Sequence, residues 1–267
     1  MIIDAHTHIY PESVAEKAIT TVVGNTGGEL DSYTDGTADC LLKSMDEADV
    51  DLSVVLPIAT DPHHGKGILE WIADLADRSP RLIFFGSVHP HDPQYKGMIR
   101  KITQMGLYGI KIHPAYQGFP ADSKEAYALY EEALKNDLIL HFHAGKDRSL
   151  PESDYTSVER FANVTKDFQG AKLILAHAGG DREWDKVLEL MKGRKCYYDI
   201  SFVLEDMMTS DHARQLYLQN EDYFLFGTDS PWRDQKRYVD LIRKSDFLSE
   251  SQKSKLFSEN LLSLIGM

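Results

Sequence analysis

Two histidines separated by one residue stand at the end of the first apolar run of this sequence. The run begins at Ile2, and His6 and His8 follow it closely. Alternate side chains of a β-strand point to the same side, so these two imidazoles are predicted to project together. Paired imidazoles are typical ligands of a transition-metal ion. Asp4, two residues before His6, either orients an imidazole or pairs with other groups in the core.

Three more side chains that could bind a metal or move a proton stand at the ends of later apolar runs. They are His143, His177 and Asp229. His141 shares a predicted strand face with His143, and either could be a ligand; the later position, next to a chain turn, favours His143. A buried core histidine is the structural alternative for His177, and a helix N-cap is the alternative for Asp229. Their shared position at run ends favours a metal site instead.

Lys111 and His113 alternate onto one face of another apolar run. A lysine on the inner face of a barrel is costly unless it is paired. Lys111 is therefore predicted to pair with a carboxylate or to bind a substrate carboxylate; a carboxylated lysine that bridges two metals is the third alternative. His113 is predicted either to bind substrate or to hold structure. Arg233, after the last run, is a further candidate for binding a substrate carboxylate.

Apolar runs alternate with helical patterns from end to end, which predicts repeated βα units and a parallel sheet. The predicted strands are 2–8, 52–58, 82–88, 108–113, 138–143, 172–177, 196–201 and 223–228. The predicted helices are 38–49, 65–79, 94–104, 123–136, 155–168, 182–192, 204–219, 232–244 and 250–265. Eight units in 267 residues favour an α/β fold of the (β/α)8 TIM-barrel type over a doubly wound sheet. Barrel active sites lie at the C-terminal ends of the strands.

No linker or repeat divides the sequence, so residues 1–267 are predicted to form a single barrel domain. The long segment between the first two strands is predicted to form a lid or specificity loop over the C-terminal face. Two helices are predicted to begin with capping boxes, at Asp122 and at Ser249, because each is followed three residues later by Glu or Gln.

Composition excludes several classes of partner. A net charge of −13 argues against nucleic acid and anionic membranes, both of which need basic patches. No apolar run approaches the ~20 residues of a membrane span. Cys40 and Cys196 form no CxxC pair, so a reduced, cytoplasmic location is expected. Nucleotide-binding glycine motifs and a GxSxG serine motif are absent from the sequence. A small molecule is the expected substrate, and association into a homo-oligomer is left open.

These runs together resemble the amidohydrolase superfamily, in particular the amidohydrolase-related group of metal-dependent hydrolases and nonoxidative decarboxylases. The matching segments are DAHTH, SMDEADVDLSVVLP, GIKIHP, LILHFHAG, LILAHAGGD, FGTDSPW and SENLLSLIG, and they extend from the first to the last βα unit. The resemblance implies a (β/α)8 barrel that holds a divalent metal ion, usually Zn²⁺ and sometimes Mn²⁺.

The resemblance also implies a set of roles. His6, His8, His143 and Asp229 match the metal ligands of the group, and His177 matches a histidine that polarises substrate or binds a second metal. Members with two metals bridge them by a Glu or a carboxylated Lys on the fourth strand. Because this strand offers Lys111 or His113 and no Glu, one metal ion is expected, with a second left open.

The leading functional hypothesis is hydrolysis of a C–O or C–N bond in an ester, lactone or amide by metal-activated water. Asp229 would carry the proton of the water, and His177 would polarise the carbonyl group. Nonoxidative decarboxylation of an unsaturated or aromatic acid is the alternative reaction at the same site. A non-catalytic degenerate barrel is less favoured, because it predicts gaps in the ligand set.

Overall fold

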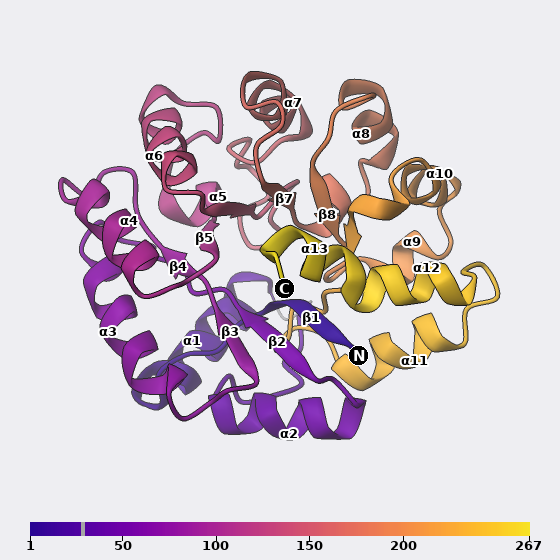
Figure 1. Ribbon diagram of the computed structural model, residues 1–267, viewed down its shortest axis with the longest axis horizontal. Helices are drawn as coiled ribbons and strands as arrows, with labels where there is room; N and C mark the ends of the chain where they lie inside the picture. Colours follow the sequence, from indigo (N-terminus) through magenta and orange to yellow (C-terminus); the bar gives the residue numbers. More distant parts are fainter. Residues whose placement is uncertain (28–29) are drawn as a thin grey trace.

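A computed structural model describes residues 1–27 and 30–267 of the chain. Parallel strands alternate with helices along these residues (Figure 1). The strands are β1 (Ile3–Thr7), β2 (Leu52–Val55), β3 (Leu82–Phe84), β4 (Gly86–Ser87), β5 (Gly109–Ile112), β6 (Ile139–Phe142), β7 (Leu173–Leu175), β8 (Tyr197–Asp199) and β9 (Phe224–Leu225). Each of the eight predicted strands is confirmed, the third as β3 and β4.

The strands follow one another in sequence order. β1, β2 and β3 form one parallel sheet, and β4 to β9 form another. Backbone hydrogen bonds join the two sheets at both edges: Phe85 N donates to Val55 O at 3.1 Å, and Asp229 N donates to His6 O at 2.8 Å. The second of these bonds brings the ends of the first and last strands side by side, as the (β/α)8 barrel predicted from the sequence requires.

Helices surround the ring of strands, except that the last one lies near the centre of the ring, across its N-terminal end (Figure 1). They are α2 (Ala38–Ala48), α3 (His64–Ala76), α4 (Tyr95–Gln104), α6 (Lys124–Lys135), α7 (Val158–Asp167), α8 (Trp184–Leu190), α10 (Asp211–Gln219), α11 (Gln235–Arg243), α12 (Glu250–Ser254) and α13 (Asn260–Ile265). The helix predicted over 204–219 is divided into α9 (Leu204–Met207) and α10, and a π-helical turn, Lys255–Glu259, joins α12 to α13.

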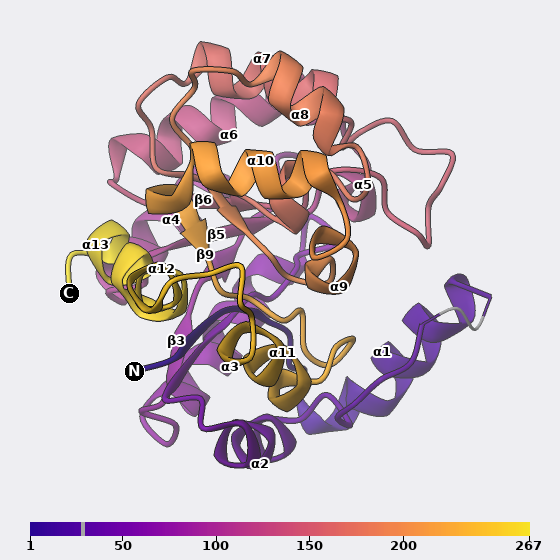
Figure 2. The same cartoon turned by 90° about the vertical axis from the view of Figure 1, so that its right-hand side faces the viewer.

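Two helices were not predicted from the sequence. α1 (Glu12–Asn25) occupies the segment expected to be a loop, and α5 (Pro114–Gln117) is a single turn after β5. α1 buries only Ala15, so its sequence carries little of the apolar periodicity that identifies a packed helix. In Figure 2, α1 stands out from the barrel on the side opposite the chain termini.

Only one of the two predicted capping boxes forms. Ser249 and Gln252 bond reciprocally at the start of α12. At α6 the prediction was wrong, because Ser123 is the N-cap and its side chain accepts from the helix. Asp122 lies one residue outside the helix and instead accepts a hydrogen bond from Arg160 at 2.6 Å.

Along β6 the inner face of the barrel changes from apolar to polar. On β6, Leu140 and Phe142 face the helices in the larger apolar cluster, whereas Ile139 belongs to a smaller cluster with Ile174. Leu261 and Leu264 of α13 pack in this smaller cluster at the N-terminal end of the strands. Farther along β6, His141 lies on the same face as Ile139, so polar groups begin where the smaller apolar cluster ends. No helix among the described residues is long and apolar enough to cross a membrane.

Candidate active site

A cleft opens at the C-terminal ends of the strands. It measures about 680 Å³ with its open mouth included, a size that suits a small molecule. Five predicted site residues line it, together with several aromatic side chains: His8, His113, His143, His177, Asp229, Tyr10, Tyr116, Phe202 and Trp232. Val22 of α1 and Leu30 also line it, so the segment after β1 does border the cleft as predicted.

His6, His8 and Asp229 converge at the inner side of this cleft; we call them the first-strand cluster. His6 Nε2 lies 3.2 Å from His8 Nε2, and Asp229 Oδ1 lies 3.4 Å and 3.1 Å from these two nitrogens. Ligand atoms placed ~2.0–2.1 Å from a tetrahedral zinc ion lie about 3.3 Å from one another. The three separations therefore fit a set of ligands around one ion.

The protons of both imidazoles point away from the cluster. His6 Nδ1 lies 2.9 Å from an oxygen of Asp199, and His8 Nδ1 lies 2.7 Å from the carbonyl oxygen of Leu56. These oxygens accept hydrogen bonds, so each Nδ1 carries its proton and each Nε2 presents a lone pair. Burial, assisted by Lys111, lowers the pKa of His6 well below its ordinary value and keeps the ring neutral. Two lone pairs and a carboxylate thus face one another, an arrangement that a cation would stabilise.

Asp229 is held as a carboxylate by its neighbours. Burial alone would raise its pKa, but His6 and His8 lower the pKa of Asp229 below its ordinary value. Its backbone has a left-handed φ of 68°, and its N–H bonds to the carbonyl oxygen of His6. The alternative role of helix N-cap is filled by Asp234, whose side chain caps α11. The Asp229 side chain is therefore available to the cleft.

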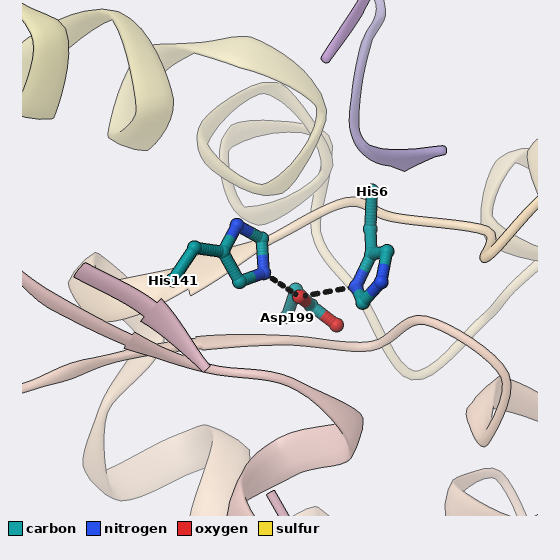
Figure 3. A group of neighbouring side chains, drawn as sticks. All are labelled: His6, His141 and Asp199. Carbon is teal, nitrogen blue, oxygen red and sulfur yellow. Dashed lines mark hydrogen bonds and ion pairs between the residues drawn. The ribbon is translucent and has the colours of Figure 1, made fainter. Parts of the chain in front are cut away.

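Asp199 is a site residue that the sequence prediction missed. One carboxylate oxygen accepts from His6 Nδ1 at 2.9 Å and from His141 Nε2 at 2.8 Å (Figure 3). The other oxygen accepts from the backbone N–H and the hydroxyl group of Ser201. Burial would raise its pKa, but His6 and His141 hold the pKa of Asp199 well below its ordinary value. Asp199 thus fixes the orientation of the His6 ring from the side that faces away from the cluster. Asp199 and Ser201 are two residues apart and share one strand face, and this pattern could have identified Asp199 from the sequence.

His143 and His177 meet at a second point of the cleft. His177 Nε2 lies 3.1 Å from His143 Nδ1, and His177 Nδ1 lies 2.9 Å from the carbonyl oxygen of Ser201. His141, the alternative ligand, is tied to Asp199 instead. The turn after His143 requires Gly145 (φ 87°), because a Cβ there would lie 2.6 Å from the backbone nitrogen of Asp181. The assignment of His143 as a ligand stays a prediction.

Lys111 lies below the first-strand cluster. Its side chain is fully buried, and Nζ lies 3.1 Å from His6 Nε2. None of the ion pairs within 4.0 Å between described residues involves Lys111, so the predicted direct pairing with a carboxylate does not form. Burial lowers the pKa of Lys111 to about 8, although Asp199 and Asp229 act in the opposite direction. Lys111 therefore donates a hydrogen bond to the lone pair of His6 Nε2.

His113, His143 and Asp147 form a second group, which we call the loop cluster. Asp147 Oδ2 lies 3.3 Å from His113 Nε2 and 3.6 Å from His143 Nε2. The ring of His113 stacks between those of Tyr116 and His143, with centroids 4.2 Å and 4.0 Å apart. Burial would raise the pKa of Asp147, but the hydrogen bonds from His113 and Ser149 lower it to about 2. Asp147 follows β6 in a loop, where no pattern in the sequence identified it.

Arg233 packs against an aromatic wall of the cleft. Its guanidinium carbon lies 3.7 Å from the ring centroid of Phe202, and that of Arg148 lies 4.6 Å from the same centroid. Phe202 and Arg148 line the cleft, whereas Arg233 and Lys111 are not among its described lining residues. Of the three predicted substrate-binding residues, only His113 is placed in the cleft wall.

Asp4 connects the first and last barrel strands. Its carboxylate accepts from Thr228 N at 2.9 Å, from Thr228 Oγ1 at 2.6 Å, from Gln235 at 2.8 Å and from His6 N at 3.1 Å. Burial raises the pKa of Asp4 to about 6, and these hydrogen bonds limit the rise. Asp4 therefore pairs in the core rather than with an imidazole, and it holds together the strands that carry His6 and Asp229.

Comparison with known proteins agrees with this architecture. The chain is similar to the 5-carboxyvanillate decarboxylase of Novosphingobium aromaticivorans, which holds manganese and 4-hydroxy-3-methoxy-5-nitrobenzoic acid (14% identity, TM-score 0.72, covering 100% of this chain and 96% of that one). It is also similar to 2,6-dihydroxybenzoate decarboxylase from Rhizobium (16%, 0.71, 99% and 98%). A third similar structure is a probable 2-pyrone-4,6-dicarboxylic acid hydrolase from Acinetobacter baumannii with citric acid bound (14%, 0.69, 100% and 99%).

These structural likenesses establish the fold. No curated protein gives a significant match to the sequence. The sequence profile of the amidohydrolases, however, matches residues 3–262, from β1 to the last helix. The chain therefore belongs to the amidohydrolase family of enzymes.

Proposed function

We propose that this protein is a metal-dependent hydrolase that cleaves a C–O or C–N bond of a small molecule, such as an ester, a lactone or an amide. One observation carries the proposal. His6 Nε2, His8 Nε2 and Asp229 Oδ1 lie 3.1–3.4 Å from one another with both imidazole protons directed outward. Such a set of acceptors fits a divalent cation.

His6, His8 and Asp229 would hold one ion, with His143 as the proposed fourth ligand. Imidazole and carboxylate donors suit Zn²⁺, and Mn²⁺ is the alternative. One ion is proposed, because Lys111 rather than a carboxylate occupies the inner face of β5. When bound, the ion supplies Lewis acidity, which polarises a carbonyl group and lowers the pKa of water.

The chain's own residues would move the protons. Asp229 is a carboxylate in the cleft wall, and we assign to it the proton of the attacking water and its transfer to the leaving group. The Nδ1 proton of His177 is committed to the carbonyl oxygen of Ser201. His177 lines the cleft, and we assign to it, together with the ion, the polarisation of the substrate carbonyl group.

A carboxylate on the substrate would meet positive or donor groups at the cleft mouth. His113 lines the cleft, and so do Lys146 and Arg148. Lys111 contacts His6, and Arg233 packs on the ring of Phe202. These two residues would therefore affect such a substrate only through those neighbours.

Nonoxidative decarboxylation is the second candidate. It is favoured by the similar fold of the 5-carboxyvanillate and 2,6-dihydroxybenzoate decarboxylases. In that reaction Asp229 would deliver a proton to the carbon that loses CO₂, so the same carboxylate would act as an acid.

Isotope labelling of the products separates the two reactions. The protein, loaded with Zn²⁺ or Mn²⁺, is incubated with a panel of esters, lactones, amides and aromatic acids. In H₂¹⁸O, hydrolysis places ¹⁸O in the acid product; in D₂O, decarboxylation places deuterium on carbon and releases CO₂. Protein stripped with a chelator, and then reloaded, is the control. A folded protein that takes up neither metal would contradict both reactions.

A further inference from the structure

The proton on His143 can occupy either of two nitrogens, and the surroundings of the ring differ between them. Nδ1 lies 3.1 Å from His177 Nε2, and Nε2 lies 3.6 Å from Asp147 Oδ2. Nε2 is buried and has no hydrogen-bond partner among the described residues. The choice between the two nitrogens decides which of them offers a lone pair to the cleft.

His177 restricts that choice. Its Nδ1 lies 2.9 Å from the carbonyl oxygen of Ser201, which can only accept, so its Nε2 presents a lone pair toward His143. If the His143 proton were on Nδ1, it would be donated to His177 Nε2, and His143 Nε2 would hold a buried lone pair 3.6 Å from the carboxylate of Asp147. If the proton is on Nε2, it points at that carboxylate, and the lone pairs of His143 Nδ1 and His177 Nε2 face the same space, as a bound cation requires.

Asp147 is built to receive that proton. Ser149 donates its backbone N–H to Asp147 Oδ1 at 2.8 Å and its hydroxyl group to the same oxygen, which leaves Oδ2 for the rings. His113 Nδ1 accepts from Tyr116 N at 3.3 Å, so His113 Nε2 carries a proton and donates to Asp147 Oδ2. His113 is therefore a donor to Asp147 and is not free to act as a ligand.

We propose that Asp147 is a positioning residue, which holds the proton of His143 on Nε2 so that Nδ1 can bind the divalent ion beside His177. This inference rests on the proposed function, because it gives the carboxylate a role only when the site takes a metal. Asp147 does not touch the ion; it acts through His143 and keeps its ring in place with the stacked ring of His113.

Three variants test the role with Zn²⁺ and Co²⁺ as probes. Asp147→Ala removes the acceptor, and we expect it to weaken Zn²⁺ binding about 10- to 100-fold, as the loss of such an outer partner typically does. Asp147→Asn keeps an acceptor oxygen and the shape of the side chain, so it should recover most of the affinity. Glu152→Ala removes a carboxylate from an exposed position on the same loop and should bind Zn²⁺ as the wild type does.

Three measurements separate positioning from general damage. They are Zn²⁺ affinity by chelator competition, the visible spectrum of the Co²⁺ form, and the ¹⁵N signals of the histidine side chains, with thermal unfolding as the check on folding. We expect His143 to show an Nε2 proton in the wild type and to lose that preference in Asp147→Ala. If Asp147→Ala and Asp147→Asn both bind Zn²⁺ with wild-type affinity and an unchanged Co²⁺ spectrum, the positioning role is wrong while the metal site stands. A folded wild-type protein without metal uptake would overturn the proposed function, and this inference with it.

Discussion

The first-strand cluster and the loop cluster contain the same residue types, two histidines and one aspartate, and both lie at the C-terminal ends of the strands. They differ in where the protons point. In the first-strand cluster, Asp199 and the carbonyl oxygen of Leu56 take the protons of His6 and His8, so only acceptors face inward. In the loop cluster, the backbone N–H of Tyr116 donates to His113 Nδ1, so the proton of His113 is on Nε2, which faces the carboxylate of Asp147.

Residue type alone therefore does not make a metal site. An imidazole becomes a ligand when a group behind it takes its proton, and it becomes a donor when its other nitrogen is already accepting. The comparison predicts that all three residues of the first-strand cluster bind the ion, whereas in the loop cluster only His143 binds it, and His113 and Asp147 orient the site.

Substitution of His8 should have the largest effect. His8→Ala removes one inward lone pair, and we expect loss of bound metal and a fall in kcat/KM of at least about 10³-fold. Metal analysis and steady-state kinetics measure both quantities, and His63→Ala, at an exposed loop position, is the control. Retention of metal at wild-type affinity by His8→Ala would remove the distinction between the two clusters.

Asp229→Asn should reduce turnover more than it reduces metal content. The amide keeps an oxygen at the ligand position but cannot take a proton, so kcat should fall about 10²- to 10⁴-fold. The measurement compares kcat with metal stoichiometry in the same preparation. Turnover within tenfold of the wild type would show that another group carries the proton.

Asp199→Asn tests the group behind His6. Its amide can no longer accept from both His6 and His141 as a charged oxygen does, so metal affinity should fall about 10- to 100-fold. Stability should fall by about 1–3 kcal/mol, because buried donors lose their acceptor. Chelator competition and denaturant unfolding of the metal-free protein report the two effects separately. Full metal affinity in this variant would mean that the tautomer of His6 is set elsewhere.

His113→Phe should have the smallest effect on Zn²⁺ affinity, and it therefore contrasts most strongly with His8→Ala. Phenylalanine keeps the stack with Tyr116 and His143 but loses the donor to Asp147. Because His113 is not expected to be a ligand, Zn²⁺ affinity should change by no more than about threefold, roughly 0.65 kcal/mol. A loss as large as that of His8→Ala would instead identify His113 as a metal ligand.

Much of the fold could be predicted because its signals are local. Apolar runs and helical periodicity located the barrel strands and the surrounding helices, and the errors have physical causes. α1 buries only Ala15, so it carries no strong periodicity. At α6, Asp122 and Ser123 both offer capping chemistry, and only the tertiary contact of Asp122 with Arg160 decides between them.

The sequence by itself determined that His6, His8 and Asp229 stand at strand ends, because strand alternation and barrel topology follow from short-range patterns. Only the tertiary structure decided which nitrogen of each histidine is free. That choice depends on acceptors distant in sequence, such as Asp199, which is 193 residues from His6. The polar groups next to a ring select its tautomer, and only the folded chain brings these groups next to the rings.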